Sequence, residues 1–149
     1  MALTKGAATG GELLYRLVHT LTSLEAAETK DVSVSRDQGL ALMALSTSSG
    51  LAMSEIAEAL GVSAGTATRV VDNLVRDDLV ERIGDPDDRR KVYVRPTESG
   101  RQRTEALRRN YERMWESVFG ELRGKRMRDV LGALEVLLGA VQKEKERAN

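Results

Sequence analysis

The stretch from Met53 to Gly100 constrains the fold most, because it arranges three kinds of local pattern in one order. Two short helical patterns are separated by the residues Gly61-Val62-Ser63. A charged hairpin pattern, DPDDRRKVYV, comes next, and a third helical pattern begins at Thr97. The sequence therefore predicts two helices joined by a tight turn, with a two-stranded ribbon beside them.

The two short helices can be bounded from their own residues. In the first, Ile56, Ala57 and Leu60 recur at helical spacing, and the Gly61 that follows tolerates a left-handed turn. Ser63 is a suitable N-cap for the second. The inward face of this second helix is predicted to consist of Ala67, Val70, Val71 and Leu74. Its opposite face would carry Gly65, Thr66, Thr68, Arg69, Asp72 and Asn73.

The ribbon is predicted from β-branched, alternating residues over Leu79–Ile83 and Val92–Val94. Gly84, Asp85 and Pro86 mark the turn between them. The expected fold is mainly α with a small β-hairpin wing, a winged helix-turn-helix over residues 35–96. In that architecture one helix lies in a DNA groove and the wing reaches a neighbouring groove.

Helical patterns flank this core on both sides. Residues 10–30 carry an apolar stripe, and residues 35–48 form a second predicted helix with Ser35 and Gln38 as a capping box. After the wing, a helix capped by Thr97 is expected to run to about Phe119, and a last one to start near Lys125. The apolar stripe of the last helix is Met127, Val130, Leu131, Leu134, Leu137, Leu138 and Val141.

We expect residues 1–149 to form a single domain in which residues 10–30 and 97–145 are dimerisation helices. A small winged domain cannot cover these apolar stripes, and a two-fold homodimer would bury them. Two recognition helices related by a dyad would then bind a palindrome with half-sites about 10 base pairs apart. The alternative is a monomeric bundle packed within one chain.

Three segments resemble a known family: SRDQGLALMAL, MSEIAEALGVSAGTATRVVDNLVRDDLVER and DPDDRRKVYVRPTESG. In order and spacing they are similar to the MarR family of bacterial transcription regulators, and the wing followed by a Thr-Glu-Ser-Gly helix start is the most specific part. The resemblance implies that Asp88 orients Arg90, which enters the minor groove. Arg89 and Lys91 would then contact phosphates, consistent with the attraction of arginine to a narrow groove.

On the predicted recognition helix, Thr66, Thr68 and Arg69 are candidates for contacts with base edges or phosphates, and Ser63 and Gly65 belong to the same candidate surface. At Ala64 and Gly65 the small side chains either let the helix dock deeply or reduce direct readout, and we favour the second interpretation. The threonines could instead be solvated, and Arg69 could pair with Asp72.

Three positions depart from the family pattern. Ala52 stands where a Ser or Thr cap is usual, so that helix start should be weaker by about 1 kcal/mol if nothing replaces the cap. Asp77-Asp78 replaces a glycine that closes the recognition helix, so an aspartate must adopt the turn. Pro96 replaces an apolar strand residue.

Composition excludes several functions. The chain has no cysteine and one histidine, so no disulfide, cysteine-based zinc site or other metal site is expected, and no cofactor is implied. With no nucleophile–base pair or phosphate-binding glycine loop, we expect no enzyme. Neither a signal peptide nor a long apolar run occurs, which predicts a cytoplasmic protein without membrane contact.

Charge is balanced at 23 basic and 23 acidic residues, so any DNA affinity must come from charge placement. The predicted DNA-contacting stretch, residues 61–96, is itself balanced at seven against seven. Salt-sensitive binding of moderate strength is therefore expected.

A small aromatic or apolar acid is a candidate effector, because relatives in the family often bind such acids between the dimer helices and the winged region. The candidate residues are Tyr15, His19, Tyr111, Trp115 and Phe119. Aromatic residues at four-residue spacing are also typical of plain core packing.

The sequence as a whole indicates a sequence-specific regulator of transcription that binds double-stranded DNA, a ligand-responsive repressor on a palindromic operator. The alternative is a winged-helix module for protein–protein assembly. The cluster Arg89, Arg90 and Lys91 at an exposed hairpin tip favours DNA.

Overall fold

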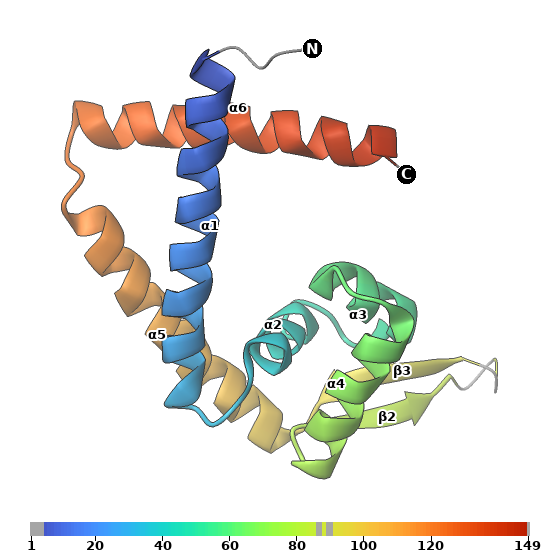
Figure 1. The fold of residues 1–149 in the computed structure, drawn as a ribbon. Helices are drawn as coiled ribbons and strands as arrows, with labels where there is room; N and C mark the ends of the chain where they lie inside the picture. Colours follow the sequence, from blue (N-terminus) through green and yellow to red (C-terminus); the bar gives the residue numbers. More distant parts are fainter. Residues whose placement is uncertain (1–4, 86–87, 89–90, 149) are drawn as a thin grey trace. The chain divides into compact units, whose positions relative to one another are not determined.

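The computed structural model describes residues 5–85, 88 and 91–148, and the fold is mainly helical with a small antiparallel sheet (Figure 1). The predicted fold class is therefore confirmed. In chain order the elements are α1 (Lys5–Lys30), α2 (Arg36–Leu45), β1 (Leu51–Ala52), α3 (Met53–Leu60), α4 (Ala64–Arg76), β2 (Val80–Gly84), β3 (Val92–Pro96), α5 (Glu98–Gly120) and α6 (Lys125–Ala148).

The chain divides into two compact units, Met1–Tyr111 and Glu112–Asn149, and α5 contributes to both. In the first unit, α2, α3, α4 and the start of α5 surround one apolar core. Its fully buried side chains include Leu42, Leu45, Ile56, Leu74 and Leu107. This core holds the helix-turn-helix and the wing together as one body.

The sheet has the strand order β1-β3-β2, with β3 in the centre. Both neighbours pair with β3 in an antiparallel register, for example Leu51 with Val94 and Arg82 with the same Val94. Strand β1 was not predicted, because a strand of two residues shows no alternation in the sequence. The range predicted for β2 starts one residue early and ends one residue short, and the range predicted for β3 ends two residues short. Pro96 lies at the end of β3 opposite Val80.

The start of α2 confirms the predicted capping box. The Ser35 amide donates to Gln38 Oε1 at 2.8 Å, and the Gln38 amide donates to Ser35 Oγ at 3.2 Å. The predicted end at residue 48 is wrong, because α2 ends at Leu45. Ser46 and Thr47 direct their hydroxyls back to the carbonyls of the last turn, which is how such residues favour helix ends over helix interiors.

Asp78 lies in the short connection between α4 and the wing. It has a φ of 55°, so an aspartate does adopt the left-handed position that was predicted for the Asp77-Asp78 pair. Its carbonyl accepts from Thr97 Oγ1 at 2.7 Å, and Thr97 caps α5 through the Gly100 amide at 3.0 Å. The end of α4, the wing and the start of α5 are thereby tied at one point.

Gly100 allows α5 to approach the strand that begins the wing. A Cβ at this position would lie 1.8 Å from the carbonyl oxygen of Leu79. That oxygen also accepts from the Thr97 amide at 3.1 Å. Only a residue without a side chain fits here, which gives the glycine of the Thr-Glu-Ser-Gly motif a packing reason.

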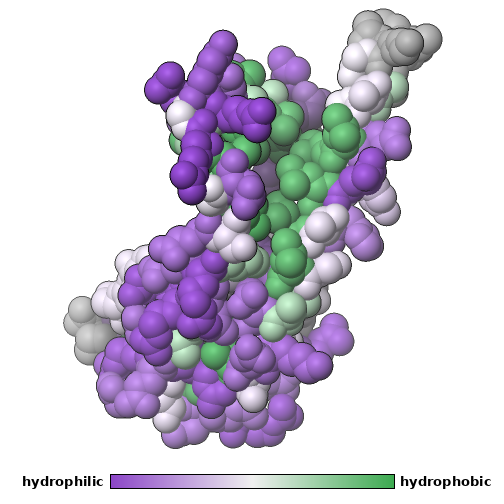
Figure 2. All heavy atoms as spheres, turned by 90° about the vertical axis from the view of Figure 1, so that its left-hand side faces the viewer, coloured by the Kyte–Doolittle hydropathy of each residue, from purple (hydrophilic) through white to green (hydrophobic). Residues whose placement is uncertain are grey.

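The terminal helices expose apolar side chains. The first helix begins at Lys5, before the predicted residue 10, and it exposes Leu13, Leu17, Val18 and Leu24. In the second unit, α6 contains no buried residue among its described positions. Its exposed large apolar residues are Leu131, Leu134, Val136, Leu137, Leu138 and Val141. On the face drawn in Figure 2, hydrophobic side chains (green) are exposed beside hydrophilic ones (purple).

None of the helices in the described part of the chain combines the length and apolarity needed to cross a membrane.

Candidate nucleic-acid interface

Helix α4 is anchored by one apolar face. Ala67, Val71 and Leu74 are fully buried and Val70 is 8% exposed, as predicted. Ser63 caps the helix by accepting from the Thr66 amide at 3.3 Å, and Gly61 takes the predicted left-handed conformation with a φ of 65°. The turn and the cap therefore fix the direction in which the opposite face of α4 points.

That opposite face is polar and solvent-exposed at Gly65, Thr68, Arg69, Asp72 and Asn73. Thr66 differs, because it is half-buried and its hydroxyl lies 3.1 Å from Ser63 Oγ. Ser63 and Thr66 therefore stabilise the helix start in this structure.

Thr68 and Arg69 keep part of their hydrogen-bonding capacity available. The Thr68 hydroxyl donates to the Ala64 carbonyl at 2.9 Å, so its oxygen lone pairs are left as acceptors. Arg69 donates from Nε to the Gly65 carbonyl at 3.4 Å, and among the described contacts its two η nitrogens have none. Thr68 is thus suited to accept from a base amino group, and Arg69 to donate to guanine or phosphate.

The suggested Arg69–Asp72 pair is wrong. Asp72 instead accepts from Arg82 Nη2 at 2.6 Å, which connects α4 to strand β2. Arg82 lies ten residues further along the chain, and only the folded hairpin brings it to α4. Sequence spacing along one helix carried no signal for this contact.

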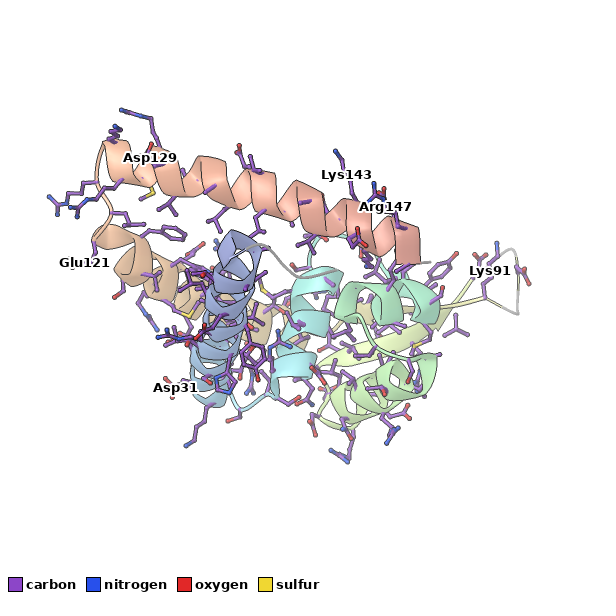
Figure 3. The ribbon with its side chains drawn as sticks, turned by 45° about the horizontal axis from the view of Figure 1, so that its top comes forward. Asp31, Lys91, Glu121, Asp129, Lys143 and Arg147 are labelled. Carbon is purple, nitrogen blue, oxygen red and sulfur yellow. The ribbon has the colours of Figure 1, made fainter. Side chains whose placement is uncertain are left out.

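The base of the wing is held by backbone pairing and a tight turn. The Asp85 amide donates to the Lys91 carbonyl at 3.0 Å, and the Lys91 amide donates to the Asp88 carbonyl at 2.9 Å. The Asp88 amide donates to Asp85 Oδ1 at 3.1 Å. Lys91 is exposed at the far end of the β2–β3 hairpin (Figure 3). Arg89, Arg90 and Pro86 lie outside the described residues.

Ion pairs neutralise several cations near this surface. Arg95 pairs with Glu81 at 2.7 Å, Arg76 with Asp77 at 3.5 Å, and Arg82 with Asp72. Within the described residues Arg69 and Lys91 form no ion pair. A balanced charge count is therefore compatible with two available cations, one on the exposed face of α4 and one on the wing.

The five candidate effector residues fall into three settings. Tyr15 is 73% exposed and lines a shallow depression of about 340 Å³ with His19. Trp115 and Phe119 contact each other in the second unit, with ring centroids 5.8 Å apart and planes tilted by 37°.

Tyr111 packs against the core of the first unit, where a Cβ on Gly39 would lie 3.9 Å from its hydroxyl. Burial, reinforced by the nearby Glu25, raises the pKa of this phenol above its ordinary value. The hydroxyl has no hydrogen-bond partner among the described residues. This setting matches the core interpretation of Tyr111.

No group of three or more His, Asp or Glu side chains suited to a metal ion occurs among the residues with described positions.

Fold and surface together define a winged helix-turn-helix protein. The model of the MarR family matches residues 31–91. The uncharacterised HTH-type transcriptional regulator YfiV of Bacillus subtilis (strain 168) is 33% identical over 91 residues, which cover 60% of this chain. The chain spans 57% of the length of that curated relative.

Solved structures agree over most of the chain. A mutant of Escherichia coli MarR in complex with operator DNA is 22% identical, with a TM-score of 0.76 over 95% of this chain and 99% of that one. Bordetella bronchiseptica BpsR, whose DNA binding is regulated by 6-hydroxynicotinic acid, is 25% identical, with a TM-score of 0.73 over 87% and 98% of the two chains. The resemblance to the MarR family of transcription regulators is confirmed, by sequence for residues 31–91 and by fold for most of the chain.

Proposed function

We propose that this protein is a transcription regulator that binds double-stranded DNA sequence-specifically through α4 and the wing. The observation that carries the proposal is the division of α4 into a buried apolar face and an exposed polar face with Thr68 and Arg69. An α-helix fits the major groove. Because the apolar face of α4 packs into the core, its polar face is held in a fixed orientation toward solvent. Arg89, Arg90 and Lys91 extend the candidate contacts to the wing.

The protein acts as a homodimer in this proposal. Leu138 of α6 is 58% exposed and Val18 of α1 is 55% exposed, and each belongs to a longer apolar stripe. Surfaces of this kind are covered in stable proteins, and a two-fold partner covers them with copies of the same residues. Such a dimer presents two α4 helices to a palindromic operator, in the cytoplasm where its target DNA lies.

We propose further that a small aromatic or apolar acid releases the regulator from DNA, which makes it a ligand-responsive repressor. Support comes from the aromatic residues on α1 and α5 and from BpsR, whose DNA binding is regulated by 6-hydroxynicotinic acid. A ligand acts this way only if its affinity differs between the DNA-competent and the released dimer.

A titration with DNA from upstream of the protein's own gene tests the DNA-binding proposal. Fluorescence anisotropy at several salt concentrations should show saturable binding. The logarithm of the association constant should fall linearly with the logarithm of the salt concentration. Arg90→Ala should weaken specific binding by about 1–3 kcal/mol, and Asp88→Ala should do so by less.

The alternative, a winged-helix module for protein–protein assembly, predicts a different result. Binding would be weak, equal on unrelated DNA, and unchanged in Arg90→Ala. The available cations Arg69 and Lys91 favour the DNA-binding proposal, since they lie on the two elements that a winged helix-turn-helix applies to DNA.

A further inference from the structure

A second concave site lies in the first unit, and none of its lining residues is among the candidate DNA contacts. It has a volume of about 560 Å³ and lies between the loop after α2, the end of β3 and the first turns of α5. Leu45 and Pro96 supply apolar lining. We call this site the arginine basin, because Arg95, Arg101 and Arg108 line it.

The lining charges favour an anion. The one carboxylate in the described lining, Glu105, is already paired, since it accepts from Arg108 at 2.7 Å and from Arg109 at 3.3 Å. Hydrogen bonding from Arg108 lowers the pKa of Glu105, so the carboxylate stays ionised and neutralises its arginine partners. Arg95 and Arg101 are also paired, with Glu81 and Glu98, but neither of these two carboxylates lines the basin, so the lining itself carries more guanidinium groups than carboxylates.

Donors from two segments that line the basin, β3 and the loop after α2, are available to a ligand. Arg95 engages Glu81 through Nε at 2.7 Å, and no described contact involves its η nitrogens. In the loop after α2, the Ser49 hydroxyl has no hydrogen bond to any described residue. Arg101 is held by Glu98 at 2.9 Å in an exposed pair, which a more highly charged anion can displace because exposed pairs are weak.

We propose that the arginine basin binds the phosphoryl group of a small phosphate monoester. A phosphate dianion accepts several hydrogen bonds at once and matches the planar fork of a guanidinium group. A cavity of about 560 Å³ is within the range of small-molecule sites, so it holds the phosphate together with a compact organic group over Leu45 and Pro96. Ser49 and Arg95 are the residues that contact the phosphate oxygens.

The test is a titration of the full-length protein with glycerol 3-phosphate, followed by the backbone amide signals in ¹H–¹⁵N spectra. We expect saturable shifts at Ser48 and Ser49, and tighter binding than for inorganic phosphate or for glycerate. Arg95→Gln and Ser49→Ala should each weaken binding, the former by about tenfold or more. Arg109→Gln is the matched control, because Arg109 pairs with Glu105 without lining the basin, and it should change binding by less than about twofold.

The amide spectrum itself reports whether each variant is folded, and Arg95→Lys, which keeps the charge without the fork, should be intermediate. The proposal is overturned if neither phosphate compound gives saturable shifts, if glycerate binds as tightly, or if folded Arg95→Gln binds like the wild type. Equal affinity for inorganic phosphate would overturn the role of the organic group. Because DNA is absent from this measurement, its result is independent of the proposed DNA-binding function.

Discussion

Asp78 shows how a single residue fixes the geometry beside the candidate interface. Its φ of 55° is a conformation that costs an L-residue about 1–2 kcal/mol and that glycine adopts without this cost. The greater freedom of glycine in the unfolded chain offsets about half of the stability that the substitution would gain. We therefore expect Asp78→Gly to raise the free energy of unfolding by about 0.5 kcal/mol in urea titrations.

The neighbouring Asp77 is the matched control for this substitution. It has a φ of −85°, and its side chain accepts from Gln38 at 3.3 Å. Asp77→Gly should therefore destabilise the fold by about 1 kcal/mol. Equal effects of the two glycines would contradict the role of backbone conformation at Asp78.

Substitutions of Arg69 and Lys91 should distinguish two contributions to DNA binding, base recognition and phosphate contact. With its η nitrogens available, Arg69 is placed to contact a base edge, so Arg69→Ala should cost about 1–3 kcal/mol and relax specificity at one position. Lys91→Ala should instead weaken binding to all sequences and lower the salt dependence by about one phosphate contact. Competition assays with single-base operator variants, at several salt concentrations, distinguish the two. The assignment fails if both variants give the same pattern.

Among the secondary-structure elements, those set by local residues were predictable from sequence. The α2 capping box, the Gly61 turn, the Ser63 cap and the buried face of α4 all follow from residues whose successive members are at most four positions apart. Strand β1 and the Arg82–Asp72 pair were not predictable, because pairing between distant segments creates them. The same limit applies to Tyr111, whose four-residue spacing from Trp115 fits both a binding site and a core.

The recognition helix contains a glycine whose role can be tested. Nothing lies within 4 Å of a Cβ built on Gly65, and alanine is the better helix former by about 1 kcal/mol. Gly65→Ala should therefore stabilise the fold. If the small residues reduce direct readout, DNA affinity should remain within about twofold of the wild type. A loss of affinity in this more stable variant would instead support deep docking of α4.

Gly100→Ala is the contrasting substitution in α5. The new Cβ would collide with the Leu79 carbonyl, so α5 must move away from the start of the wing. We expect a loss of about 2–3 kcal/mol in the free energy of unfolding, the scale of overpacking in a rigid site. Urea titration of both glycine variants under one condition makes the comparison direct.

For the whole molecule, the proposed dimer depends on one face of α6. Leu138 lies on the apolar stripe, whereas Val136 is 76% exposed and lies on the opposite side of the helix. Leu138→Glu should shift sedimentation equilibrium at micromolar concentration from twice the 16.3 kDa chain mass toward the chain mass itself. Val136→Glu should remain dimeric. A wild-type monomer, or dissociation in both variants, would contradict the proposed interface.

The proposed function depends on two α4 helices, one from each subunit, contacting DNA together. Selection of bound duplexes from a random-sequence pool, using the full-length protein, tests this most directly. We expect enrichment of a palindrome whose half-sites lie about 10 base pairs apart, with its strongest preferences at the base pairs facing Thr68 and Arg69. Failure to enrich any sequence, or enrichment of a single half-site alone, would contradict DNA binding by a two-fold dimer.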